Sequence, residues 1–225
     1  MMLSVVMPVL NEAAGLEAAL EALAPLRDRG AEVIVVDGGS RDGTATLARP
    51  LTDRVMSAPR GRGAQMNTGA AAATGDVLLF LHADTRLPDH TDTLIRDGLA
   101  QSTRLWGRFD VGFTDGALPL VAAMMNLRSR LSGIATGDQA IFVTREAFVR
   151  AGGFPEIALM EDVALSTRLK ALSRPLCLRA RVTTSPRRWQ ARGTVRTVLL
   201  MWRLRLAFSL GADPQRLARS YGYGD

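Results

Sequence analysis

Cysteine and histidine are scarce in this chain. Its 225 residues include one cysteine, Cys177, and two histidines, His82 and His90. A single cysteine excludes an internal disulfide and suits a reducing compartment. These residues do not have the spacing of a zinc site. The composition therefore excludes a disulfide-stabilised fold and a structural zinc centre.

Long hydrophobic runs are also missing. The longest candidate, residues 116–125, is interrupted by Pro119 and falls short of the roughly 18 uncharged apolar residues that span a bilayer. Residues 1–10 lack the basic start of a secretory leader and lead directly into Asn11 and Glu12. We therefore expect a cytoplasmic protein and leave open an association with the inner face of the membrane.

Lysine and aromatic residues are few. Lys170 is the only lysine among 28 basic residues, which outnumber 22 acidic residues and give a net charge of +6. Arginine binds phosphate through two parallel hydrogen bonds, so this balance favours phosphorylated ligands or an anionic membrane face. Aromatic residues make up 5% and do not alternate with basic ones, which argues against a nucleic-acid partner.

Short apolar runs alternate with helical segments in the first half of the chain. The expected strands are 3–9, ended by Pro8, then 32–36, 54–57 and a run that begins at Val77. Between them we expect three helices. The first follows Asn11, which can cap it, the second follows Thr44, and the third begins at Gly61. This alternation predicts an α/β fold with a doubly wound, mostly parallel sheet and flanking helices.

The second half is less regular. Strands are expected at 109–113 and 140–143, and helices at 117–131, from Arg145, at 161–172 and at 194–210. The last of these helices is apolar with interspersed arginines, so it suits either core packing or contact with an anionic membrane.

Two acids follow buried strands. Asp37 comes after the run 33–36, and Asp84 comes after the run 77–81. Parallel strands present their carboxyl ends at one edge of a sheet, where open α/β sheets bind ligands. Asp84 therefore suits a divalent cation that bridges phosphate oxygens. The alternative for both acids is a local turn, which is strong for Asp37 because Gly38 and Gly39 follow it.

Polar segments elsewhere allow both a functional and a structural interpretation. The loop Arg60-Gly61-Arg62-Gly63 brings two guanidinium groups to the start of a helix, or is a solvated basic loop. Glu161 and Asp162 begin a helix. They either stabilise it by their interaction with the helix dipole or supply a general base. Two further segments are Gly137-Asp138-Gln139, which suits acceptor contact or a turn, and Arg187-Arg188-Trp189, which suits a diphosphate clamp or a basic surface patch.

In this order, the segments resemble the motifs of family 2 glycosyltransferases with the GT-A fold. The resemblance covers about residues 3–190. It is carried by 6–12, 35–44, 61–69, Gly75-Asp76, His82-Ala83-Asp84, Gly137-Asp138-Gln139, Gly152-Gly153-Phe154, Glu161-Asp162-Val163 and Arg187-Arg188-Trp189. The nearest subgroup consists of small soluble bacterial members, some of which occur near radical-SAM and selenium-related proteins.

The resemblance implies an inverting enzyme that moves a sugar from a nucleotide-diphosphate sugar to an acceptor hydroxyl, with an acceptor that the motifs do not identify. Asp162 matches the catalytic base, with Glu161 beside it. Substrate contacts are implied at Pro8, Asn11, Glu12, Asp37, Gly38, Arg62, Asp138, Gln139, Arg187, Arg188 and Trp189. The tripeptide at 187–189 looks like a shortened Gln-x-x-Arg-Trp motif of processive members.

Asp84 matches the last acid of the metal-binding Asp-x-Asp motif and would hold Mn²⁺ or Mg²⁺ on the diphosphate. His82 stands where the first acid is expected. Imidazole can ligate Mn²⁺, but the site loses a hard oxygen. Processive relatives carry transmembrane helices, and their lack here implies transfer of a single sugar.

One domain over 1–225 is expected. Its parts would be a nucleotide-sugar-binding half at about 1–90, an acceptor and catalytic half at about 91–190, and a C-terminal amphipathic helix and tail at about 191–225. Two other functions are considered. A nucleotidyltransferase would carry a Gly-rich loop with Arg and Lys near the N-terminus, where this chain has 8–12. A non-enzymatic nucleotide-sugar-binding module would not need Glu161 and Asp162.

Overall fold

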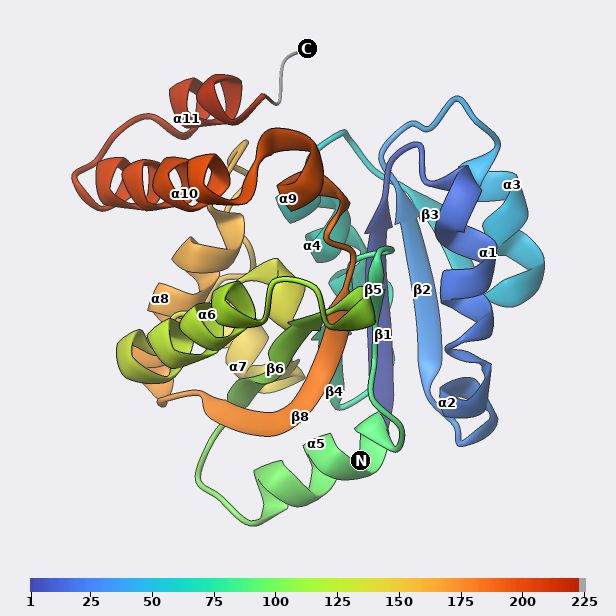
Figure 1. Ribbon diagram of the computed structural model, residues 1–225. Coiled ribbons are helices and arrows are strands. Elements are labelled where there is room, and N and C mark those ends of the chain that lie inside the picture. The colour runs from blue at the N-terminus through green and yellow to red at the C-terminus, as the bar shows by residue number, and fades with distance from the viewer. Residues whose placement is uncertain (223–225) are drawn as a thin grey trace.

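The computed structural model describes residues 1–222, apart from the side chains of Asp115 and Arg188. Within these residues an eight-stranded sheet has the order β3-β2-β1-β4-β7-β6-β8-β5 (Figure 1). The strands are β1 (Leu3–Val9), β2 (Glu32–Asp37), β3 (Arg54–Ser57), β4 (Val77–Phe80), β5 (Thr85–Arg86), β6 (Trp106–Phe113), β7 (Ile141–Thr144) and β8 (Leu176–Thr184). The sheet is mixed, and its two halves are built differently.

The N-terminal half is parallel, as its alternating pattern predicts. β1 pairs in parallel with β2 and β4, and β2 pairs in parallel with β3. All residues of β1, β2 and β4 are buried, because helices cover both faces of the strands.

β1 does not end at Pro8 but continues to Val9. Its pairing with β4 stops at Val6. The Val6 carbonyl accepts the last hydrogen bond on the β4 side of the strand, from the N–H of Leu81. Pro8 lies two residues further along β1, so its backbone nitrogen faces the same side, beyond this last bond. A proline at this position therefore leaves no strand hydrogen bond unmade.

The C-terminal half departs from the parallel pattern. β7 is antiparallel to β4 and β6, β5 is antiparallel to β8, and β8 is parallel to β6. β8 was not expected from the sequence. Arg179 and Arg181 are exposed on it, and such charges on a half-covered strand obscure its apolar character.

The helices follow the expected positions with several additions. They are α1 (Ala13–Glu21), α2 (Ala24–Asp28), α3 (Thr44–Ala48), α4 (Arg62–Ala72), α5 (Thr91–Ala100), α6 (Pro119–Ser132), α7 (Arg145–Arg150), α8 (Glu161–Leu172), α9 (Arg187–Arg192), α10 (Thr194–Ser209) and α11 (Pro214–Tyr221). α2, α5, α9 and α11 were not expected. No helix in residues 1–222 is long and apolar enough to cross a bilayer.

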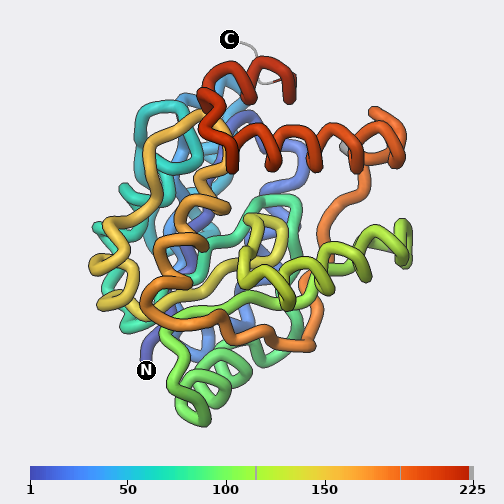
Figure 2. The backbone as a smooth tube through the Cα atoms, turned by 90° about the vertical axis from the view of Figure 1, so that its left-hand side faces the viewer, coloured from blue at the N-terminus to red at the C-terminus, as the bar shows by residue number. Residues whose placement is uncertain are grey.

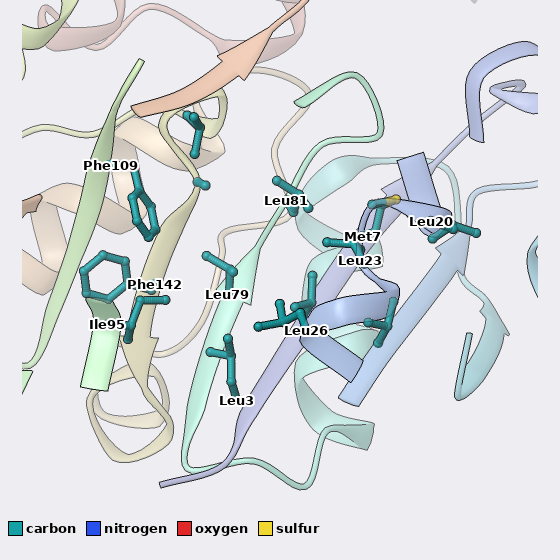
Figure 3. Close-up of a cluster of buried hydrophobic side chains, with 14 of the residues drawn as sticks. Leu3, Met7, Leu20, Leu23, Leu26, Leu79, Leu81, Ile95, Phe109 and Phe142 are labelled. Carbon is teal, nitrogen blue, oxygen red and sulfur yellow. The ribbon is translucent and has the colours of Figure 1, made fainter. Parts of the chain in front are cut away.

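The period of two along the strands divides the core between the two faces of the sheet. Figure 3 shows one cluster, in which Met7 and Leu79 lie with Leu20 and Ile95 from the helices α1 and α5. The intervening strand residues, such as Val6 and Phe80, form a second cluster with α4, α7 and α8. This alternation fixes the strand register, because a slip of one residue would exchange the two faces.

The C-terminal helices pack as a separate layer. Leu204 of α10 is buried in a small cluster with Leu159, Leu217 and Tyr221. In Figure 2, α10 lies close to α11 on one side and above α6 on the other. One face of α10 stays exposed, at Val195, Leu199, Trp202 and Leu206.

Candidate active site

The carboxyl ends of β1 and β4 meet at one edge of the sheet. Val6 of β1 is paired with Phe80 of β4, so the loops that follow these strands emerge side by side. They border a cavity of about 450 Å³ that also receives the loop before α4. The polar residues of its lining are Glu12, Arg60, Arg62, Gln65, His82, Asp84 and Glu161, and Pro8 lies in its wall. We call it the donor-side cavity.

The Glu12 carboxyl interacts electrostatically with charged residues on the opposite wall of this cavity. Its side chain is exposed at the rim, and partial loss of water there is the main cause that raises its pKa. The Asp84 carboxylate raises the Glu12 pKa further, and the Arg62 and Arg187 guanidiniums oppose the rise. Acids and arginines from distant parts of the sequence therefore converge here.

A second cavity of about 370 Å³ adjoins the first. Both cavities are lined by Arg62, His82, Asp84 and Glu161. The second cavity extends between α6, the start of α8 and α10, and its lining includes Asp138 and Asp162. We call it the acceptor-side cavity. The two spaces thus meet at a shared wall of charged side chains.

Glu161 lies in the shared wall and is only 6% exposed. Burial is the main cause that raises its pKa from the ordinary 4.5 to about 7, and the neighbouring Asp162 carboxylate adds to the rise. Arg62 and His82 oppose it. Near neutral pH the Glu161 carboxyl therefore holds its proton for part of the time.

The loop before β7 fixes the Asp162 carboxylate. Its Oδ2 accepts a hydrogen bond of 2.9 Å from the backbone N–H of Gly137, and its Oδ1 accepts one of 2.7 Å from the N–H of Val163. Both bonds use backbone donors, so the orientation of Asp162 depends on the chain path around it. A lone pair on each oxygen is left for a substrate proton.

His82 packs against the same loop. Its Nδ1 lies 3.4 Å from Oδ1 of Asp138, and a Cβ on Gly137 would overlap the imidazole ring at Cε1 and Nε2. The imidazole therefore couples the end of β4 to the loop that holds Asp162. A change in the position of the His82 ring would therefore displace the loop at Gly137 and Asp138.

α4 brings Arg62 to the shared wall because it is tied to the loop before α8. The Asn67 amide exchanges two hydrogen bonds of 2.9 Å with the backbone N–H and carbonyl of Phe154. A Cβ on Gly63 would approach the Pro155 carbonyl oxygen to 2.5 Å. A small residue at this position thus permits the close contact between α4 and the loop.

Several residues predicted for the site make their observed contacts within the protein. The Asp37 carboxylate is buried and accepts from the N–H groups of Gly39 and Ser40, the turn considered as its alternative. Gly38 packs against Gln65. Gln139 is fully buried, and its amide oxygen accepts from the Thr136 N–H, so it supports the loop from beneath. The prediction that Gln139 faces substrate conflicts with this burial.

Asn11 does not cap α1, contrary to expectation. Its backbone is left-handed, with φ of 54°, and the first helical turn has no side-chain cap. The Asn11 amide oxygen instead accepts from the Arg41 N–H, and its own N–H donates to Ser40. Asn11 therefore ties the loop after β1 to the loop after β2 outside the donor-side cavity.

The basic-aromatic tripeptide lies in α9. Trp189 packs edge-on against Phe113, with ring centroids 5.9 Å apart, and lines the acceptor-side cavity. Arg187 is exposed, and its positive charge opposes the rise in the pKa of Glu12. The side chain of Arg188 lies outside the described residues.

Arg128 and Arg205 were not expected in the site. They enter the acceptor-side cavity from α6 and α10. Nothing in the local sequence distinguishes them from the other arginines, because their proximity arises only when the two helices pack together.

Comparison with known proteins agrees with this architecture. The model of the glycosyl transferase family 2 matches residues 4–116, half of the chain. The chain belongs to this family. The matched part includes β1 to β6 and the whole lining of the donor-side cavity up to Asp84.

A curated relative of this family 2 chain is the succinoglycan biosynthesis protein ExoA of Rhizobium meliloti. It is 38% identical over 106 residues, which are 43% of this chain and 32% of ExoA. The chain thus matches about a third of the length of this relative.

Solved structures extend the likeness across the sheet. Staphylococcus aureus TarS in complex with UDP-GlcNAc has a TM-score of 0.68 at 20% identity, over 82% of this chain and 58% of that one. A mannosyltransferase of Pyrobaculum calidifontis in complex with GDP-Man and Mn²⁺ has a TM-score of 0.63 at 22% identity, over 98% and 69%. The expected GT-A fold is confirmed.

The residues that could bind a cation in this family 2 chain are few. Within residues 1–222, no three His, Cys, Asp or Glu side chains are grouped to bind a metal. Asp84 offers one carboxylate at the shared wall, whereas His82 turns its Nδ1 to Asp138. Mg²⁺ is commonly bound through one or two carboxylates and substrate phosphates, and Asp84 fits that arrangement.

Proposed function

We propose that this chain transfers a single sugar from a nucleotide-diphosphate sugar to an acceptor hydroxyl, with inversion at the anomeric carbon. The observation that carries the proposal is the shared wall of the two cavities, which contains Arg62, Asp84 and Glu161. A donor in the first cavity would present its anomeric carbon at this wall. An acceptor in the second cavity would then approach from the side opposite the leaving diphosphate.

Asp162 is the proposed base. The acceptor oxygen forms a bond to the anomeric carbon while its proton passes to the Asp162 carboxylate. The bond between the anomeric carbon and the diphosphate oxygen breaks, and its electron pair leaves on the diphosphate. Arg62, with Arg60 in the same loop, binds the negative charge that develops there.

A divalent cation, Mn²⁺ or Mg²⁺, held at Asp84 would supply further positive charge to the diphosphate. Support comes from the mannosyltransferase structure, which contains GDP-Man and Mn²⁺. TarS was crystallised with UDP-GlcNAc, so the nucleotide differs between structures of this fold. We therefore propose the nucleotide sugars as a class of donor.

We also propose a division of labour along the chain. Residues of about 1–90 bind the donor, and those of about 91–190 supply the catalytic base and acceptor contacts. The C-terminal part, from about 191, closes the acceptor-side cavity through α10, to which Trp202 and Arg205 belong.

A donor screen tests the proposed function. The chain is heated with each common nucleotide sugar, with and without Mn²⁺, and the melting temperature is measured. One donor should stabilise the fold by mass action and be hydrolysed slowly to the nucleoside diphosphate, and proton NMR should detect the inverted sugar anomer. Failure of every donor to stabilise the chain or to be hydrolysed would refute the proposal, as would a retained anomer.

A further inference from the structure

The acceptor-side cavity contains two cations in largely apolar surroundings. Arg128 enters from α6 and Arg205 enters from α10, helices that lie one above the other in Figures 1 and 2. The apolar lining includes Met125, Met160, Val163, Val198 and Met201. Guanidinium groups in such a lining lose water and need an anionic partner.

Part of the hydrogen-bonding capacity of these two guanidiniums is unused among the described residues. Nη2 of Arg128 and Nε of Arg205 are buried and have no hydrogen-bond partner among the described residues. Nη1 of Arg128 donates to the Ile134 carbonyl, at 3.2 Å. Unpaired donors of a buried charge are costly. Both donors are therefore available to a ligand that enters the cavity.

Arg128 and Arg205 line the same cavity as the proposed base, Asp162. Burial is the main cause that lowers the pKa of Arg128 to about 10, and Arg205 lowers it further, whereas Asp162 opposes the fall. Burial also lowers the pKa of Arg205, against Asp162 and Asp138. Because all three residues line one cavity, an anionic group bound there would face both arginines and Asp162.

Apolar stripes lead from this cavity to the surface. On α6 the exposed apolar residues are Leu120, Met124, Leu127 and Leu131, and on α10 they are Val195, Leu199, Trp202 and Leu206. In each set the residues are spaced by 4, 3 and 4 positions, so they share one helix face. Met124, Leu127, Leu131 and Trp202 also line the cavity.

We propose that the acceptor is an amphiphile whose phosphate is bound by Arg128 and Arg205 and whose apolar chain lies along the stripes of α6 and α10. This inference rests on the proposed function, because it places the acceptor hydroxyl beside Asp162. Two planar guanidiniums match the oxygens and the double charge of a phosphate monoester.

A single amphiphile fits this site better than a lipid surface does. The two cations are half-buried in the cavity, where a headgroup that enters individually can reach them and the plane of a bilayer cannot. Exposed arginines on α10, such as Arg196 and Arg203, would serve surface docking instead. These two groups of arginines can therefore be distinguished by mutation.

Binding of octyl phosphate tests the proposal, with octanol and inorganic phosphate as the two halves of the probe. Isothermal titration calorimetry on the whole chain measures affinity, and tryptophan fluorescence reports on Trp189 and Trp202 in the cavity wall. Octyl phosphate should bind at least tenfold more tightly than either half. Arg128→Gln and Arg205→Gln should each weaken it about tenfold or more, whereas the matched control Arg203→Gln on the outer face of α10 should not.

The melting temperature checks that the variants fold. Removal of a buried cation that lacks full pairing should leave it unchanged or raise it. Equal binding of octyl phosphate and octanol would overturn the proposal, and so would equal effects of Arg128→Gln and Arg203→Gln. Binding to anionic phospholipid vesicles without binding of octyl phosphate would also overturn it and assign the stripes to a membrane surface. Donor stabilisation in the Arg128→Gln variant is a separate test of the proposed function.

Discussion

The carboxylate of Asp162 accepts a hydrogen bond of 2.9 Å from the backbone N–H of Gly137, across 25 residues of sequence. This bond connects the first turn of α8 to the loop before β7. It orients the proposed base toward the acceptor-side cavity, and it makes the geometry of that base depend on the His82 ring that packs against Gly137.

Asp162→Asn should reduce sugar transfer by about 10²- to 10⁴-fold, the usual contribution of a general base. An asparagine oxygen can still accept from the Gly137 N–H, so the fold and donor affinity should persist. Initial rates and the donor-induced melting shift measure the two effects separately. Asp97→Asn, at an exposed position in α5, serves as the control and should lose much less. Retention of full turnover in Asp162→Asn would remove the base from this position.

Gly137→Ala should lower turnover strongly because its Cβ would overlap the His82 imidazole and displace the loop that orients Asp162. Gly15→Ala is the matched control. Nothing lies within 4 Å of a Cβ at Gly15, an exposed position in α1, so that change should stabilise the chain by about 0.5–1 kcal/mol.

The double variant His82→Ala with Gly137→Ala tests the cause of that loss. Removal of the ring should restore part of the turnover that Gly137→Ala loses, because the overlap is then gone. Additive losses in the double-mutant cycle would show that His82 and Gly137 act independently.

Stability should fall as the pH rises from about 4.5 to 7. The pKa of Glu161 is raised to about 7 by burial, so between these values the folded chain keeps a proton that the unfolded chain has released. By linkage this proton favours the fold at low pH, and the advantage is lost as pH rises through the folded pKa, by at most about 3 kcal/mol.

Urea unfolding of Glu161→Gln at several pH values checks this dependence. Because glutamine does not titrate, the variant should gain stability relative to the native chain as the pH rises from 5 to 8. Glu156→Gln changes an exposed residue and should leave the profile unaltered. Parallel profiles for Glu161→Gln and the native chain would contradict the assignment.

Asp84→Asn should raise the Mn²⁺ concentration needed for half-maximal activity by tenfold or more, because an amide oxygen is a weaker ligand than a carboxylate. A titration of activity with Mn²⁺ at saturating donor measures this change. Asp89→Asn, in the exposed loop that follows, should leave the titration unaltered. An unchanged titration for Asp84→Asn would place the cation elsewhere.

The parallel half of the fold could be predicted because its signals are local. The central apolar runs are short, are bounded by turn residues, and are buried on both faces, so the strand at 32–36 was predicted to within one residue of its observed bounds. β8 could not be predicted in this way because exposed arginines interrupt its apolar pattern. Its place beside β6 depends on a pairing between distant segments.

The candidate site likewise contains residues that the sequence predicted and residues that only the structure revealed. By itself the sequence determined that acids follow the strand ends, and hence that Asp84 lies at the ligand edge of the sheet. Only the tertiary structure decided that Glu161 is buried with a raised pKa, that Gln139 lies beneath the surface, and that Arg128 and Arg205 share one cavity. The reason is physical: desolvation and the pairing of charges depend on neighbours that the packing of separate elements brings together, whereas strand patterns depend on neighbours in the chain.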